Sequence, residues 1–249
     1  YQATSIDFMD LTAITKKDWT MAFCNELKQR NLDVVWQLPS GTRSEALDVE
    51  TLTALYETGC RLLVYAPESG SQESLDIVKK RLKLPNIIES MRQAARIGHT
   101  VKMNVIIGFP HEKHRHVMAS VFFAWKVAFI GAEDLNLAIF NPYPGSELFK
   151  QLCDQGVIGE LDDDYFMRLL VQGSLSRAVS FTPHISPWFL AIARVAGMGG
   201  FYTLAYLTHP GRIWRVIRNA LSPRFQAHNL IEQRIHDFIV RRRAEKASA

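Results

Sequence analysis

The stretch "RLLVYAPESGSQESL", residues 61–75, joins a short apolar run to a polar turn and then to a helix-like segment. The apolar run has the β-branched and aromatic content of a buried strand, and Glu68 and Ser69 follow it directly. A carboxylate and a hydroxyl at the end of a core strand indicate a ligand site if the strand belongs to a parallel sheet. The alternative is that Ser69 or Ser71 only caps the following helix.

The same order of segments recurs on both sides of that stretch. Strand-like runs cover residues 5–10, 34–40, 61–66, 101–109 and 135–140. Helix-like runs follow them at residues 16–30, 48–59, 71–80 with 85–98, 114–131 and 145–156. Asp48 is the expected N-cap of the second helix, and Gly59 the expected residue after its end. Five β-then-α units predict an α/β fold with a parallel sheet, either barrel-type or doubly wound, with apolar strands covered on both faces.

Polar, glycine and proline residues also follow three of the other strand-like runs. The segments are "QLPSGTR" at residues 37–43, "NVIIGFPHE" at 104–112 and "FNPYPGSE" at 140–147. Because the carboxyl ends of parallel strands meet at one edge of the sheet, we expect these segments to form one ligand-binding mouth.

Composition and charge limit the class of protein. With 249 residues, 47% hydrophobic and 22% charged, the chain is long and apolar enough for a globular core. There is no secretory signal pattern, and Cys24, Cys60 and Cys153 are too widely spaced for a disulfide framework, which favours the cytoplasm. Residues 1–186 carry a net charge of −3 and residues 187–249 a net charge of +7, so the tail is basic.

The run from Trp36 to Phe149, with "GTR", "APESGSQESL", "NVIIGFPHE" and "FNPYPGSELF" in that order, resembles the core of radical S-adenosylmethionine enzymes. The resemblance covers about residues 4–155 and is strongest to the branch with a cobalamin-binding domain. It implies a partial (β/α)6 TIM-like barrel lacking its first strand over residues 1–158, and a C-terminal α-helical, basic extension over residues 159–249.

The resemblance also implies which residues hold S-adenosylmethionine. Glu68 matches the motif whose carboxylate binds the ribose hydroxyls, with assistance from Ser69. Residues 104–112 resemble the fifth-strand motif GxIxGxxE that holds the adenine, with Asn104 in the first glycine position and Ile106 and Gly108 matching.

Two further cofactor-binding residues are expected at the end of the strand-like run at residues 34–40. Arg43 is placed to pair with the methionine carboxylate through its guanidinium fork, and Ser40 lies in the same loop. No catalytic residue is identified, and the segment after the last strand is expected to shape the substrate side.

The family's CxxxCxxC loop, which holds a 4Fe–4S cluster, does not occur in the sequence, and the three cysteines are interpreted as structural. We expect the first strand and its cluster cysteines upstream of Tyr1, and with them a cobalamin-binding domain. The resemblance then implies an enzyme that makes a 5′-deoxyadenosyl radical for C–H activation, such as methyl transfer or rearrangement in lipid, pigment or natural-product biosynthesis. The alternative is a cluster-less, non-catalytic barrel that binds a nucleotide-like ligand or acts as a membrane-peripheral partner.

The partners implied are a small-molecule or lipid-like substrate and an electron donor such as flavodoxin or ferredoxin, with no signal for nucleic acid. The run "HEKHRH", residues 111–116, lacks the spacing of a zinc site and is expected to be an exposed loop. Residues 187–207 have the length of a membrane span, but Arg194 and the glycines favour a packed helix pair or an interfacial segment.

The segment that follows is predicted to be a basic amphipathic helix. Arg212, Arg215 and Arg218 recur every three residues, beside apolar neighbours. Such a helix predicts peripheral contact with an anionic membrane surface through residues 187–224. The alternative is that its apolar face packs on the protein.

Overall fold

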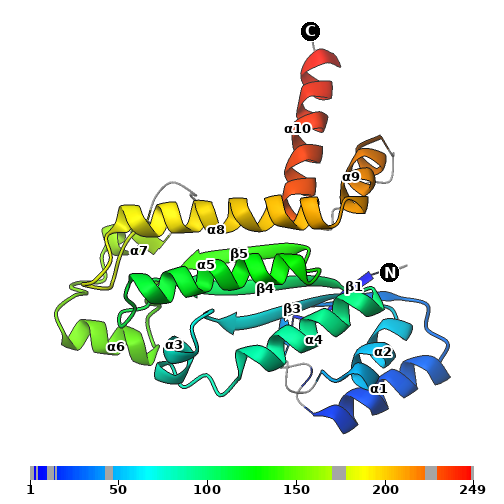
Figure 1. Cartoon of the computed structure of the whole chain (residues 1–249), viewed down its shortest axis with the longest axis horizontal. Helices are drawn as coiled ribbons and strands as arrows, with labels where there is room; N and C mark the ends of the chain where they lie inside the picture. The colour runs from blue at the N-terminus through cyan, green and yellow to red at the C-terminus, as the bar shows by residue number, and fades with distance from the viewer. Residues whose placement is uncertain are drawn as a thin grey trace.

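The computed structural model describes residues 3, 5–9, 14, 16–42, 47–169, 178–221 and 229–247 (Figure 1). Its centre is a five-stranded, wholly parallel sheet in the order β1-β2-β3-β4-β5. The strands are β1 (Ser5–Asp7), β2 (Val35–Thr42), β3 (Cys60–Glu68), β4 (Thr100–Ile107) and β5 (Asp134–Ile139). The five predicted strands and their parallel arrangement are confirmed.

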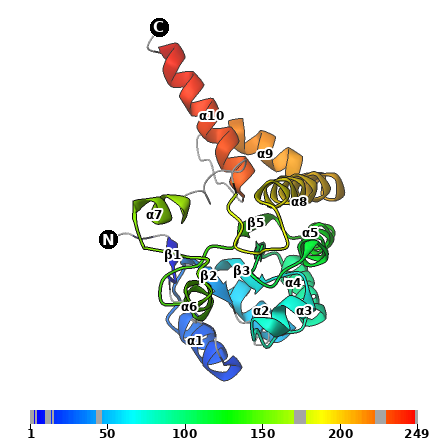
Figure 2. The same ribbon diagram turned by 90° about the vertical axis from the view of Figure 1, so that its left-hand side faces the viewer.

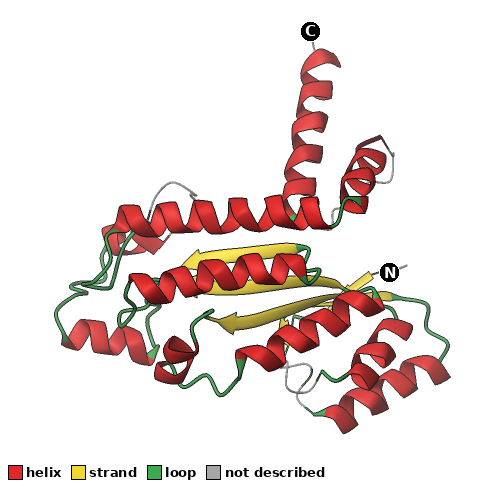
Figure 3. Cartoon of the chain, viewed as in Figure 1, coloured by secondary structure: helices red, strands yellow, loops and turns green. Residues whose placement is uncertain are grey.

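Ten helices are described along the chain (Figure 3). The first five are α1 (Lys17–Gln29), α2 (Val49–Glu57), α3 (Gln72–Ile77), α4 (Leu84–Ile97) and α5 (His114–Phe129). The others are α6 (Glu147–Asp154), α7 (Asp163–Leu169), α8 (Pro187–Thr208), α9 (Gly211–Leu221) and α10 (Leu230–Ala247).

Helices cover one face of the sheet, as Figure 2 shows for α1, α2, α4, α5 and α8. The reason is the strand order: each strand lies beside its predecessor, and right-handed crossovers that always advance in the same direction place the helices that connect the strands on the same side. The expectation of strands covered on both faces was therefore wrong. Along β4, residues alternate between half-buried and fully buried, with Met103 and Val105 facing the helices.

Two of the predicted helix boundaries are confirmed by hydrogen bonds. The side chain of Asp48 accepts from the backbone N–H of Thr51 at 2.9 Å and caps α2, while Gly59 after its end has φ +95°. The side chain of Ser71 accepts from the N–H of Ser74 and caps α3. The capping interpretation is thus correct for Ser71.

The long apolar segment forms one continuous helix, α8, rather than a helix pair. By length and composition it is sufficient to cross a membrane, yet it packs against α5 and β5, and 44% of its most apolar window is buried. Its glycines serve this packing. A Cβ at Gly197 would lie 2.5 Å from Leu137, and one at Gly200 would lie 2.3 Å from the indole of Trp125.

The arginines of α9 do not form an outward basic face. Arg212 is buried and donates to the carbonyls of Ala132 and Gly131 at 2.9 and 2.7 Å. Arg215 pairs with Glu133 and with the buried Glu232, so Arg218 alone of the three is exposed. The predicted three-residue spacing is present, but that side of α9 packs on the protein and the opposite, apolar side is exposed.

Candidate active site

The carboxyl end of β3 places Glu68 at the edge of the sheet. Glu68 has φ +74°, a conformation that costs a non-glycine residue free energy, and β3 changes register between Tyr65 and Glu68. Its side chain is 30% exposed, and Oε1 pairs with Nζ of Lys80 at 3.0 Å. Oε2 has no hydrogen-bond partner among the described residues, so this carboxylate can still accept from a ligand.

Ser69, the next residue, points into the protein and not into the mouth. It is fully buried, and its hydroxyl lies 3.4 Å from Oε1 of Glu112 and 3.3 Å from the hydroxyl of Ser120. It also accepts from the N–H of Ser71 at 3.1 Å. These bonds give Ser69 a structural task in the loop, and its expected assistance in ribose binding stays a prediction.

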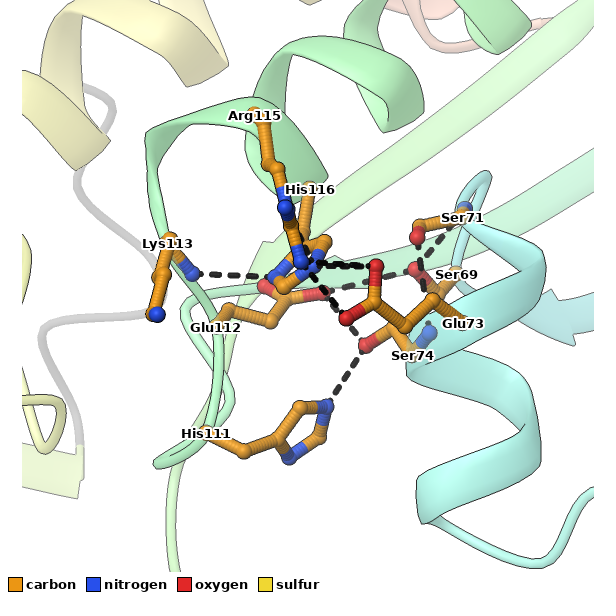
Figure 4. A network of polar contacts seen from close by, with 9 residues as sticks. All are labelled: Ser69, Ser71, Glu73, Ser74, His111, Glu112, Lys113, Arg115 and His116. Carbon is orange, nitrogen blue, oxygen red and sulfur yellow. Dashed lines mark hydrogen bonds and ion pairs between the residues drawn. The ribbon is translucent and has the colours of Figure 1, made fainter.

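Glu112 is the centre of that network (Figure 4). Its side chain is fully buried, and Oε1 accepts from the hydroxyl of Ser74 at 2.8 Å. Oε2 accepts from the N–H groups of Gly108 and Phe109 at 2.7 and 3.3 Å. Burial raises the pKa of Glu112, and the three hydrogen bonds oppose that rise. The carboxylate therefore ties the loop after β4 to the start of α3.

The loop after β3 also approaches α5 closely. The N–H of Gly70 donates to the hydroxyl of Ser120 at 2.9 Å, and a Cβ at Gly70 would lie 2.6 Å from the Cα of Ser120. Only glycine fits at this contact. The sequence expectation of an exposed loop at residues 111–116 is thereby wrong in part, because Glu112 and His116 are both buried.

Strand β4 supplies the other expected cofactor residues. Glu68 pairs in register with Val105, so Asn104 and Ile106 flank it on the neighbouring strand. The side-chain Oδ1 of Asn104 is buried and has no hydrogen-bond partner among the described residues, which is a costly state for a polar atom. Gly108 has φ +87°, and its N–H is already used by Glu112.

The expected residues after β2 lie less clearly in the site. Ser40 lies within the end of β2 and not after it, and its hydroxyl donates to the carbonyl of Met9, after β1, at 3.1 Å. Arg43 lies outside the described residues. The structure thus brings Glu68, Asn104 and Ile106 together.

Three features of the site were missed from the sequence. Lys80 pairs with Glu68 from twelve residues further along the chain, and Ser74 and Ser120 reach Glu112 and Ser69 from separate helices. A cavity of about 1030 Å³ also opens beyond the ends of β4 and β5, between α6 and residues 180–183. The one signal available in the sequence was Glu112, an acid that follows Gly108 and the end of a strand, since a buried carboxylate needs converging donors.

No group of three histidine, cysteine, aspartate or glutamate side chains that could hold a metal occurs among the described residues. Cys24 and Cys60 are buried, and burial raises the pKa of both thiols, which disfavours the thiolate that binds iron. The two buried thiols therefore do not fit a 4Fe–4S cluster, and the interpretation of the three cysteines as structural residues stays a prediction.

Comparison with known proteins gives sequence relatives that match about 53–60% of this chain. An uncharacterised methyltransferase of Pyrococcus horikoshii is 29% identical over 150 residues, which is 60% of this chain and 32% of the relative. Cytidylyl-2-hydroxyethylphosphonate methyltransferase of Streptomyces wedmorensis is 28% identical over 145 residues, 55% of this chain and 27% of that protein. No family model matches the chain.

A third relative is the anaerobic magnesium-protoporphyrin IX monomethyl ester cyclase of Rubrivivax gelatinosus, 25% identical over 53% of this chain and 23% of that protein. The sequence relatives support a radical S-adenosylmethionine (radical SAM) enzyme core in this chain. The chain spans about a third or less of the length of these relatives.

Two solved structures show a weaker likeness to this chain. The cobalamin-dependent S-adenosylmethionine radical enzyme OxsB aligns with a TM-score of 0.46 and 13% identity over 67% of this chain and 24% of OxsB. Methylornithine synthase aligns with a TM-score of 0.44 and 14% identity over 78% of this chain and 55% of the synthase. These values are too low to transfer a property from either structure.

Proposed function

We propose that this chain is the S-adenosylmethionine-binding part of a radical SAM enzyme, built as a partial (β/α)6 barrel. The main observation is where Glu68 lies. The register of β3 and β4 places its half-buried carboxylate between Asn104, whose Oδ1 is unpaired, and the aliphatic Ile106. Sequential strand order with helices on one face supports the barrel arrangement, because it leaves the opposite face of the sheet to line an interior.

The residues present fit S-adenosylmethionine. Oε2 of Glu68 is free to accept a hydrogen bond from a ribose hydroxyl, and Oδ1 of Asn104 is free to accept from an N–H group such as an adenine amine. Ile106 offers an apolar surface to a ring. Lys80 holds the Glu68 carboxylate in place, and Glu112 fixes the loop at Gly108.

The radical chemistry needs more than these residues. When bound at a reduced 4Fe–4S cluster, S-adenosylmethionine supplies a 5′-deoxyadenosyl radical that abstracts hydrogen from carbon. We propose that the cluster ligands, and a cobalamin-binding domain, come from residues other than these 249, and that flavodoxin or ferredoxin supplies the electron. Within this chain, the described residues bind and orient the cofactor and exclude water from it.

The test is S-adenosylmethionine binding to the full chain by isothermal titration calorimetry. Glu68→Gln keeps the size of the side chain but removes its charge, and we expect about 10- to 100-fold weaker binding, as for the loss of a charged hydrogen bond. Glu57→Gln, an exposed glutamate paired with Lys28, is the matched control and should bind as the wild type does. Equal affinity in Glu68→Gln and the wild type would contradict the ribose assignment.

We also propose a cytoplasmic protein with peripheral membrane contact through residues 187–224. With Arg212 and Arg215 turned inward, support for this contact comes from the exposed apolar side chains of α9, Ile213, Trp214 and Ile217. Co-sedimentation of the full chain with anionic and neutral lipid vesicles tests the proposal. Absence of the protein from the pellets of both vesicle types would contradict the proposal.

A further inference from the structure

The cavity beyond β4 and β5 lies next to the proposed cofactor site but is separate from it. Pro110 and His111 after β4 and Phe140 and Asn141 after β5 form its floor. Ile106 packs against the small apolar cluster that includes Phe140, so the cofactor side and the cavity share a wall. A volume of about 1030 Å³ is sufficient for a ligand of ordinary organic size.

The walls of the cavity are mainly apolar and carry no excess charge. Phe140, Phe181, Leu148 and Leu152 supply apolar surface. The charged side chains in the lining are Lys79 and Glu147, which pair with each other at 3.1 Å. A polyanion such as a nucleoside diphosphate would find no free cation among these residues, so the cavity suits a largely apolar molecule.

His111 lines the cavity, and its hydrogen bonds fix the tautomer of its ring. Its Nε2 lies 2.8 Å from the hydroxyl of Ser74, and that hydroxyl donates its one proton to Oε1 of Glu112 at 2.8 Å (Figure 4). Ser74 must therefore accept from Nε2–H of His111, which leaves Nδ1 as a hydrogen-bond acceptor. Nδ1 has no partner among the described residues, and Figure 4 draws it clear of the network.

The surroundings keep the ring neutral and in place. Phe109 stacks on His111 with ring centroids 5.8 Å apart. Burial lowers the pKa of His111, and the nearby His116 lowers it further, which outweighs the opposing effect of Glu73. A neutral imidazole with a fixed tautomer offers one acceptor of fixed direction to a molecule in the cavity.

We propose that this cavity is the substrate pocket of the enzyme, and that it takes a mainly apolar organic molecule whose hydroxyl or N–H group donates to Nδ1 of His111. The proposal rests on the proposed function, because the cavity is the substrate pocket only if the cofactor binds beside it. Ser74 and Glu112 act as positioning residues, since they set the tautomer without touching the ligand.

Two fluorescent probes, 2-naphthol and naphthalene, test the pocket in the full chain because they differ by one hydroxyl. We expect the wild type to bind 2-naphthol about five- to tenfold more tightly than naphthalene, the value of one hydrogen bond. His111→Phe should bind both probes within twofold of each other. His184→Phe changes an exposed histidine beside the cavity and should keep the wild-type preference.

A second measurement separates positioning from structure. Nitrogen-15 NMR of the histidine rings should show His111 in the Nε2-protonated form, and Ser74→Ala should mix the tautomers while naphthalene binding stays unchanged. A preference for 2-naphthol retained in His111→Phe, or no binding of either probe to the wild type, would overturn the proposal. Calorimetry with S-adenosylmethionine on the same samples reports the cofactor site independently, so failure of one site is distinguishable from failure of the other.

Discussion

Two buried carboxylates, Glu112 and Glu232, show how differently the two halves of the molecule stabilise a buried acid. At the mouth of the sheet, Glu112 is held by neutral donors: the Ser74 hydroxyl and the N–H groups of Gly108 and Phe109. Among the C-terminal helices, the Glu232 carboxylate accepts from the guanidinium of Arg215 at 3.0 Å, and its backbone N–H donates to the side chain of Asn229, which caps α10.

The difference concerns what each network fixes. The neutral donors to Glu112 belong to the loop after β4 and to the start of α3. Glu112 therefore determines the shape of the backbone around the proposed cofactor and His111. A charged partner compensates Glu232 and joins α9 to α10 and, through Glu133, to the start of β5. The first network shapes a site, and the second fastens the helical extension to the sheet.

The largest loss of stability is expected when Glu112, the acceptor for the neutral donors, is removed. Glu112→Ala leaves the N–H groups of Gly108 and Phe109 and the Ser74 hydroxyl without a partner in a buried region. We expect the free energy of unfolding to fall by about 3 kcal/mol, measured by urea denaturation. Glu57→Ala, at an exposed surface pair, should change it by less than about 0.5 kcal/mol.

A smaller effect is expected when the charged network loses its cation. Arg215→Ala removes the cation that Glu133 and Glu232 share, but Arg215 and Glu133 are partly exposed and water can reach them. We expect a loss of about 2 kcal/mol in the same denaturation experiment. S-adenosylmethionine affinity should be unchanged in this variant. A larger loss here than in Glu112→Ala would reverse the comparison.

The smallest effect is a pH dependence that belongs to Glu112. Because its pKa is raised in the folded protein, the folded state binds a proton more readily than the unfolded chain does. The wild type should therefore lose stability relative to Glu112→Gln as pH rises from about 4.5, the ordinary carboxyl value, through the raised pKa, with a slope of at most about 1.4 kcal/mol per pH unit. A difference between the two that stays constant with pH would show that the carboxyl group is not desolvated.

The order of the elements was predictable from the sequence, and so was the edge of the sheet that carries the site. Strand and helix patterns have different periods, and polar residues such as Glu68 at the end of β3 and Asn104 within β4 stand out against apolar runs. The Glu112 network was not predictable, because Ser69, Ser74 and Ser120 reach it from positions up to 51 residues apart.

The orientation of α9 shows a second limit of sequence patterns. Spacing of three residues correctly places Arg212, Arg215 and Arg218 near one another on the helix. Periodicity does not say which side of a helix meets the protein. Backbone carbonyls at Gly131 and Ala132 and the carboxylates of Glu133 and Glu232 made the arginine side the inner one.

Because the connecting helices cover only one face of the sheet, ligand binding to the other face should raise the thermal stability of the protein. On the face of the sheet opposite α2, α4, α5 and α8, Asn104 and Ile106 are only half-buried, so a molecule seated there would serve as an additional layer of the interior. A ligand that binds only the folded chain, present at a hundred times its dissociation constant, adds about 2.7 kcal/mol to the folded state. Melting temperature in the presence of candidate molecules is therefore a direct assay for what belongs on that face.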